Sequence, residues 1–126
     1  MAMKSKRKGK KGELEAVALL KAHGFPDAAR GQQFKGGGNS PDVTGLPGFH
    51  IEVKRAENFH LYPALDQACA DAGGTLNVPL VLHRRSDKPW VAVLKAFDLL
   101  ILVERLRRLE KARDEANSYP QGLKHG

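Results

Sequence analysis

The sequence predicts an α/β fold with a central mixed five-stranded sheet flanked by helices. Segments with helical periodicity alternate with shorter segments in which apolar and polar residues alternate, in the order α-β-β-β-α-β-β-α. The chain has 126 residues, of which 41% are hydrophobic and 28% are charged. That length and composition are typical of one domain with a core of its own.

The first segment with helical periodicity covers residues 13–23. Leu14, Val17 and Leu20 lie on one face, and Gly24 is a natural helix stop. The residues before it, 1–10, have too little apolar surface to pack, so we expect them to form a disordered arm.

Three strands are expected next. Residues 26–34 form a short strand, and the glycine-rich residues 34–41 form a loop. Residues 42–55 are predicted to form a hairpin, because side chains in its second arm alternate strictly between apolar and polar. The apolar face is Phe49, Ile51 and Val53, and the polar face is His50, Glu52 and Lys54.

The second half of the chain is predicted to contain two helices and two strands. A helix covers residues 61–72, strands cover 78–82 and 90–94, and a final helix covers about 97–116. The predicted organisation is an arm, one folded domain and a tail, over residues 1–10, 11–118 and 119–126.

Positive charge is concentrated at the start of the chain. There are 21 Lys and Arg residues against 14 Asp and Glu, a net charge of +7. Six basic residues lie in the arm and just after it: Lys4, Lys6, Arg7, Lys8, Lys10 and Lys11. Such an arm suits a polyanion, because each neutralised phosphate releases counterions. The alternative is a solvated tail that maintains solubility.

Several classes of protein are not expected. The single cysteine, Cys69, excludes an internal disulfide framework and a cysteine-based zinc site. The longest apolar run, Leu99 to Val103, is far shorter than the roughly 20 residues of a membrane span. The basic start leads into Glu13 rather than an apolar signal segment. We therefore expect a cytoplasmic protein with no membrane partner.

Four residues form a candidate catalytic set: Glu13, Asp42, Glu52 and Lys54. Glu52 and Lys54 are two residues apart on one strand and therefore share a face. Asp42, on the preceding strand, joins that face only if it lies opposite His50 or Glu52. A turn with an odd number of residues pairs it with His50 and places Val43 on the apolar face, so this register is favoured.

Carboxylates on neighbouring strands beside a lysine suit Mg²⁺, with Mn²⁺ as a substitute, because both ions prefer oxygen ligands. A metal of this kind activates water as a nucleophile and offsets charge that develops on a phosphate. The lysine can orient the water or stabilise the transition state. The alternative is a surface ion pair between Glu52 and Lys54.

The sequence resembles the PD-(D/E)xK nuclease superfamily in Pro41-Asp42 followed by Glu52-Val53-Lys54. More narrowly, it looks like the archaeal-type Holliday junction resolvases and their phage-borne relatives. Those proteins place a basic-Gly-x-x-x-Glu segment at the start of the first helix and a Gly-Phe pair at its end. Here the two features are residues 8–13 and Gly24-Phe25.

The resemblance implies a restriction-endonuclease-like fold and a role for each matched residue. Glu13, Asp42 and Glu52 would be the metal-binding acids, and Lys54 would be the catalytic lysine. Glu15 is the rival for the first acid, although its spacing fits the pattern less well.

The resemblance also suggests DNA contacts outside the catalytic set. Arg30 matches a family arginine that contacts phosphate. Ser40 is a candidate for a hydroxyl ahead of the aspartate, and Gln67 for a helical glutamine near the site or a solvated residue. The expected DNA-binding residues are Lys4, Lys6, Arg7, Lys8, Lys10, Lys11, Arg30, Lys35 and Arg55. His50 shares the acidic face, where we expect an ordinary surface histidine.

The expected function is a metal-dependent, structure-selective endonuclease that resolves four-way DNA junctions by paired phosphodiester hydrolysis. The alternatives are a nuclease of the same superfamily acting on linear duplex or flap DNA, and a non-catalytic DNA-binding module. Paired cuts predict a symmetric homodimer. The last helix is apolar all round at Leu99, Leu100, Ile101, Leu102 and Val103, which is more than one buried face requires, so part of the interface is placed on residues 97–109. The alternative is a helix buried in the core of the monomer.

Overall fold

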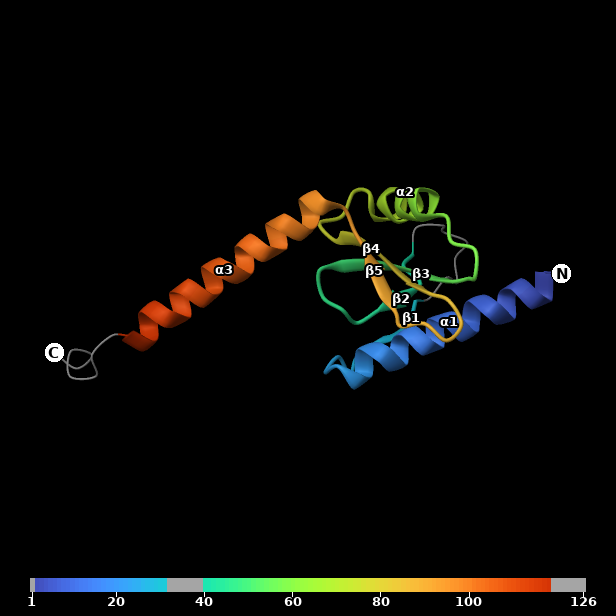
Figure 1. Cartoon of the computed structure of the whole chain (residues 1–126), viewed down its shortest axis with the longest axis horizontal. Coiled ribbons are helices and arrows are strands. Elements are labelled where there is room, and N and C mark those ends of the chain that lie inside the picture. Colours follow the sequence, from blue (N-terminus) through green and yellow to red (C-terminus); the bar gives the residue numbers. More distant parts are fainter. Residues whose placement is uncertain (1, 32–39, 119–126) are drawn as a thin grey trace. The chain divides into compact units, whose positions relative to one another are not determined.

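The computed structural model describes residues 2–31 and 40–118, which form three helices and five strands (Figure 1). Their order agrees with the predicted order. In chain order the elements are α1 (Ala2–Ala22), β1 (Ala29–Arg30), β2 (Val43–Thr44), β3 (Phe49–Arg55), α2 (Leu61–Ala72), β4 (Val78–Arg84), β5 (Val91–Val93) and α3 (Ala96–Ser118).

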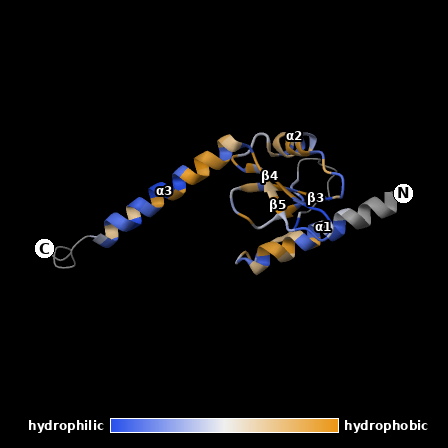
Figure 2. Ribbon diagram, in the orientation of Figure 1, coloured by the Kyte–Doolittle hydropathy of each residue, from blue (hydrophilic) through white to orange (hydrophobic). Residues whose placement is uncertain are grey.

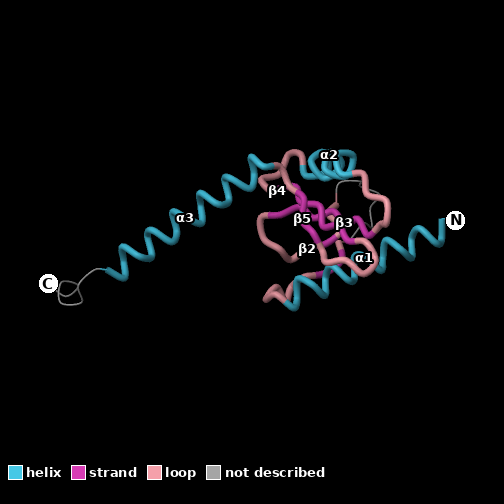
Figure 3. The backbone as a smooth tube through the Cα atoms, in the orientation of Figure 1, coloured by secondary structure: helices cyan, strands magenta, loops and turns pink. Residues whose placement is uncertain are grey.

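The five strands form one mixed sheet in the order β1-β2-β3-β4-β5. Neighbouring strands are antiparallel except β3 and β4, which are parallel and are connected through α2. Parallel neighbours need such a crossover, because the chain must return to the same end of the sheet. Figure 3 shows the strands gathered between α1 and α2.

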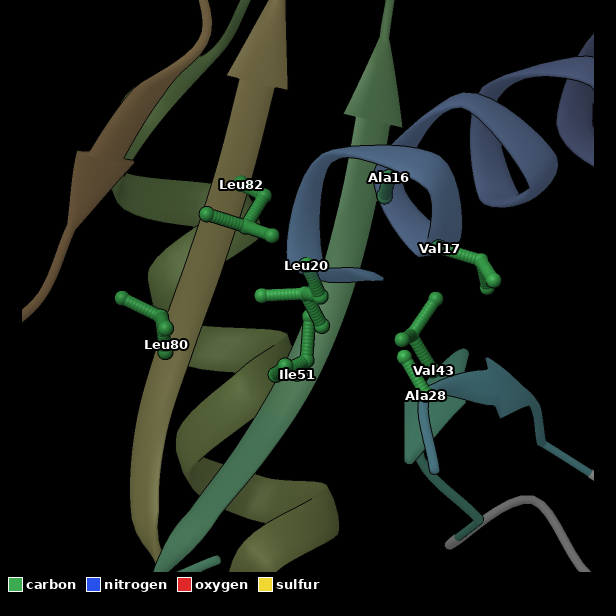
Figure 4. Packing of buried hydrophobic residues seen from close by; sticks show 8 residues of the cluster. All are labelled: Ala16, Val17, Leu20, Ala28, Val43, Ile51, Leu80 and Leu82. Atoms are coloured by element: carbon green, nitrogen blue, oxygen red, sulfur yellow. The ribbon is translucent and has the colours of Figure 1, made fainter. Parts of the chain in front are cut away.

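The helices α1 and α2 cover opposite faces of the sheet. Ile51 and Leu80 pack with α1 in a cluster that is shown in Figure 4 and consists of Ala16, Val17, Leu20, Ala28, Val43, Ile51, Leu80 and Leu82. Val81, the residue after Leu80, packs instead with Ala64, Leu65 and Ala68 of α2. This division follows from the alternation of side chains along a strand.

Glycines lie at the turn between β2 and β3 and at the end of α2. Gly45, between β2 and β3, has a φ of +98°, and a Cβ there would lie 2.5 Å from the Cα of Ala28. Only glycine fits a close approach with this backbone conformation. Gly73 ends α2, and its N–H donates to the carbonyl of Ala70, as the Gly73-Gly74 pair suggests in the sequence.

The start of α1 and the length of β1 differ from the prediction. The helix begins at Ala2 rather than residue 13, so the structure has helix where a disordered arm was expected. Lysine and arginine are good helix formers, and each residue added to an existing helix costs little. β1 contains only Ala29–Arg30 of the expected residues 26–34, because only these residues pair with β2.

The chain divides into two compact units, Met1–Leu94 and Lys95–Gly126. The boundary between the units lies within residues 11–118, for which the sequence predicted one folded domain. No residue of α3 is buried. No helix in residues 2–31 and 40–118 has the length and apolar character to cross a membrane.

Candidate active site

The register of β2 and β3 brings Asp42 beside Glu52. Val43 lies opposite Ile51, so the residue before Val43 faces the residue after Ile51. The Asp42 N–H donates to the carbonyl of Ile51 at 2.8 Å, and Asp42 Oδ2 accepts from the Val53 N–H at 2.8 Å. The expected pairing of Asp42 with His50 is therefore wrong by two residues. Its consequence is confirmed, because Val43 lies in the apolar core.

The polar face of β3 is buried rather than solvated. His50 and Glu52 are each 3% exposed. His50 Nε2 lies 3.1 Å from Glu52 Oε1. The expectation of a surface histidine is therefore wrong, because α2 covers this face of the sheet.

A third group joins this pair from α2. Ligand atoms of His50, Glu52 and Asp71 all lie within 4.8 Å of one another. Asp71 is half-buried and lies at the C-terminal end of the helix. The carboxyl groups of three acids, Asp42, Glu52 and Asp71, therefore meet on one face of the sheet.

The electrostatics of this cluster favour a proton on Glu52. Burial, the charges of Asp42 and Asp71, and hydrogen bonds with both of them raise the pKa of Glu52 to about 9. Loss of the proton would place a charge in a dry environment beside two other acids, which is unfavourable. A divalent cation would offset the same repulsion.

The donor set fits a divalent metal ion. His50, Glu52 and Asp71 could hold one, with two carboxylates and one imidazole as ligands. Carboxylate oxygens suit Mg²⁺ and Mn²⁺, whereas imidazole also suits Zn²⁺ and other transition metals. The raised pKa of Glu52 supports the fit, because a cation can take the place of that proton.

Lys54 lies two residues beyond Glu52 on the same face of β3. Its Nζ donates to Gln67 Oε1 of α2 at 3.2 Å. The two residues also line a pocket of about 230 Å³ with Phe59, His60 and four neighbours. The structure thus brings together the predicted lysine and the glutamine that the sequence left open between a site role and a solvated one.

The backbone of β3 at Lys54 is held by a buried histidine. His83 Nδ1 donates to the Lys54 carbonyl at 2.8 Å. The His83 ring stacks on Phe59 with centroids 3.9 Å apart and an interplanar angle of 10°. These contacts fix the strand from which Lys54 extends.

The acids of α1 form ion pairs with arginines. Glu13 Oε1 lies 2.9 Å from Arg30 Nε. Glu15 Oε1 lies 3.0 Å from Arg55 Nε and 3.3 Å from Arg84 Nη1. Arg30 lies opposite Val43, which packs against α1, so the Glu13–Arg30 pair belongs to the α1 face.

The remaining expected DNA contacts are placed only in part. Lys10 and Lys11 are exposed on α1, and Ser40 is half-buried before β2. Arg55 is held between Glu15 and the Ser86 hydroxyl. The structure does not describe Lys35, and it does not describe the side chains of Lys4, Lys6, Arg7 and Lys8.

Asp71 is the site residue that the sequence analysis missed. One signal pointed to it: it follows Ala68 by three residues and so lies on the buried stripe of α2. An acid on an otherwise apolar stripe indicates a polar partner across the interface. Its partner, Glu52, could be identified only from the packing of α2 on β3.

Comparison with protein-family models, curated proteins and solved structures finds no match for this chain.

Proposed function

We propose that this chain is a divalent-metal-dependent DNA endonuclease of the PD-(D/E)xK type, with a restriction-endonuclease-like fold, that resolves four-way junctions. The proposed cofactor is Mg²⁺, for which Mn²⁺ would substitute. The proposed partners are branched DNA and a second copy of the chain, in the cytoplasm.

The observation that carries the proposal is the placement of Asp42, Glu52 and Lys54. The three residues lie within 12 positions of the chain. Asp42 directly precedes β2, whereas Glu52 and Lys54 are in β3, so they share one face of the sheet only because of the β2–β3 register. Burial adds weight to this observation. A buried acid beside two others lowers the stability of the fold, and such costs are typical of functional sites.

Asp42 and Glu52 would hold the metal with Asp71 as the third carboxylate, because Glu13 pairs with Arg30 on the opposite face of the sheet. The resemblance favours Glu13, whereas the geometry favours Asp71, which contacts Glu52. When bound, the metal would supply an activated water and offset charge on the phosphate.

The chain's own groups have distinct tasks in this proposal. Gln67 holds the Lys54 ammonium at the site through the hydrogen bond between them. From there the lysine would orient the attacking water or stabilise the charge of the transition state. Lys10 and Lys11, both exposed on α1, would contact DNA phosphates and position the substrate without specifying its sequence.

The test is cleavage of three synthetic DNA substrates by the full chain: a four-way junction, a linear duplex and a flap. Each is incubated with Mg²⁺ and with EDTA. We expect paired nicks in the junction with Mg²⁺, none with EDTA, and little cleavage of the other substrates.

Each other outcome has a defined meaning. Preferred cleavage of duplex or flap DNA would keep the chemistry but replace the substrate. Binding of DNA without cleavage in Mg²⁺ would indicate a DNA-binding module. Cleavage that persists in EDTA would contradict the metal mechanism.

A further inference from the structure

Several large apolar side chains of α3 are exposed. Leu99 is 46% exposed, Leu106 is 55% exposed and Leu109 is 69% exposed. Figure 2 shows hydrophobic residues concentrated in the N-terminal half of the helix and hydrophilic residues in the other half. Apolar surface concentrated in this way marks an interaction site.

The leucines of α3 follow the spacing of a coiled-coil seam. Leu99, Leu102, Leu106 and Leu109 are separated by three, four and three residues, which is the a–d–a–d pattern of a heptad repeat. Three of them are exposed, and Leu102 is half-buried. Because they lie along one line of the helix, a second helix with the same pattern could cover them together.

Charges beside the seam select the partner and its direction. Arg105 precedes Leu106 and so takes a g position, whereas Glu110 follows Leu109 and takes an e position. In a parallel pair of identical helices, Arg105 lies beside Glu110 of the second copy. In an antiparallel pair, Arg105 would lie beside Arg105 of the second copy, which is repulsive.

We infer that α3 pairs with α3 of a second copy as a parallel two-stranded coiled coil, with the four leucines as its seam and Arg105–Glu110 as its cross-chain ion pairs. The inference rests on the proposed function only in what the dimer is for: paired cuts in a four-way junction need two active sites, one in each copy. α3 starts directly after the first unit, at Ala96. A parallel pair therefore attaches both nuclease units at the same end of a coiled coil about 35 Å long.

Sedimentation of the full chain at micromolar concentration tests the pairing, with two matched variants. Leu106→Asp places a charge in the seam and is expected to weaken the dimer roughly 100-fold or more. Leu100→Asp is the control, because Leu100 is 65% exposed but lies outside the seam. It should leave the dimer unchanged. Since α3 belongs to a compact unit separate from residues 1–94, we expect both variants to keep the first unit folded, as circular dichroism would show.

Charge exchange tests the direction independently. Arg105→Glu should weaken the dimer roughly 5-fold, since it places two like charges together twice in each dimer. Adding Glu110→Arg to the same chain should restore it. An antiparallel pair would show no such rescue.

Disulfide trapping provides a second reading of direction. In a Cys69→Ser background, Arg113→Cys places one thiol at the next a position, where parallel helices bring the two copies together. We expect oxidation to link the two chains.

The outcomes separate this inference from the proposed function. A monomer, or a dimer that Leu106→Asp leaves intact, would overturn the pairing while leaving metal-dependent nicking untouched. A dimer without rescue and without the disulfide would overturn the parallel direction. Conversely, a coiled-coil dimer that cleaves no DNA would refute the nuclease and leave the pairing in place.

Discussion

Acidic side chains on the two faces of the central sheet have opposite electrostatic surroundings. On the α1 face, Glu15 contacts two arginines, Arg55 and Arg84. On the α2 face, Glu52 is buried with two other acids and a histidine, and its pKa is raised to about 9. Ion-paired acids contribute to the stability of the folded state, whereas a cluster of buried acids lowers it.

Glu15 and Glu52 show that two carboxylates of one small fold can have opposite electrostatic surroundings. All of these acids are glutamate or aspartate, so residue type alone does not distinguish them. What distinguishes them is whether the surrounding groups complement the charge. A divalent metal bound by His50, Glu52 and Asp71 would complement the negative charge of the acid cluster.

The largest expected effect is on cleavage. Asp42→Asn or Glu52→Gln should reduce junction cleavage in Mg²⁺ by roughly 1000-fold or more, because each change removes a proposed metal ligand. Gel-shift affinity in EDTA should change little, since binding depends on phosphate contacts from basic residues. Near-normal cleavage by Asp42→Asn would contradict the site assignment.

The next prediction concerns the third acid. Asp71→Asn should raise the Mg²⁺ concentration needed for half-maximal cleavage by roughly 10- to 100-fold, because it removes a carboxylate that contacts Glu52. Glu13→Gln is the matched comparison on the other face. If Glu13→Gln has the larger effect, the third ligand is Glu13, as the family resemblance implies.

The raised pKa of Glu52 predicts a pH dependence of stability in the metal-free protein. Between the ordinary pKa of 4.5 and about 9, the folded chain keeps a proton that the unfolded chain has lost. Stability should therefore fall as the pH rises through this range, by at most about 1.4 kcal/mol for each pH unit from this group.

Urea denaturation in EDTA at several pH values between about 5 and 9 measures this slope. Glu52→Gln should reduce it, since the amide does not titrate. A slope that is the same in both proteins would show that Glu52 does not carry the effect. Added Mg²⁺ should restore more stability at high pH than at low pH, because ligands must lose their protons to bind it.

The smallest effect is expected on the α1 face. Glu15→Gln removes the charge that Arg55 and Arg84 share, and should lower the free energy of unfolding by about 1–2 kcal/mol. Cleavage by the folded variant should stay near normal. A large loss of cleavage at full folding would place Glu15 in the site instead of Glu13.

Local patterns were sufficient for much of the fold. The alternation in residues 49–55 and the periodicity in 61–72 predicted β3 and α2 with the bounds that the structure has. Both signals depend on side chains within one element, so the chain order of helices and strands could be inferred without knowing what packs on what. The sequence also indicated that Asp42 and Glu52 share one face of the sheet. A register shifted by one residue would have moved Val43 out of the core.

Tertiary structure decided the features that depend on contacts between distant segments. The sequence did not distinguish which helix covers the polar face of β3, and α2 does so, which buries His50 and brings Asp71 to Glu52. The placement of Glu13 beside Arg30 likewise depends on α1 packing over β1. Periodicity describes the neighbours of a residue along one element, whereas these pairs lie 17 or more residues apart and form only when the sheet and its two helices pack together.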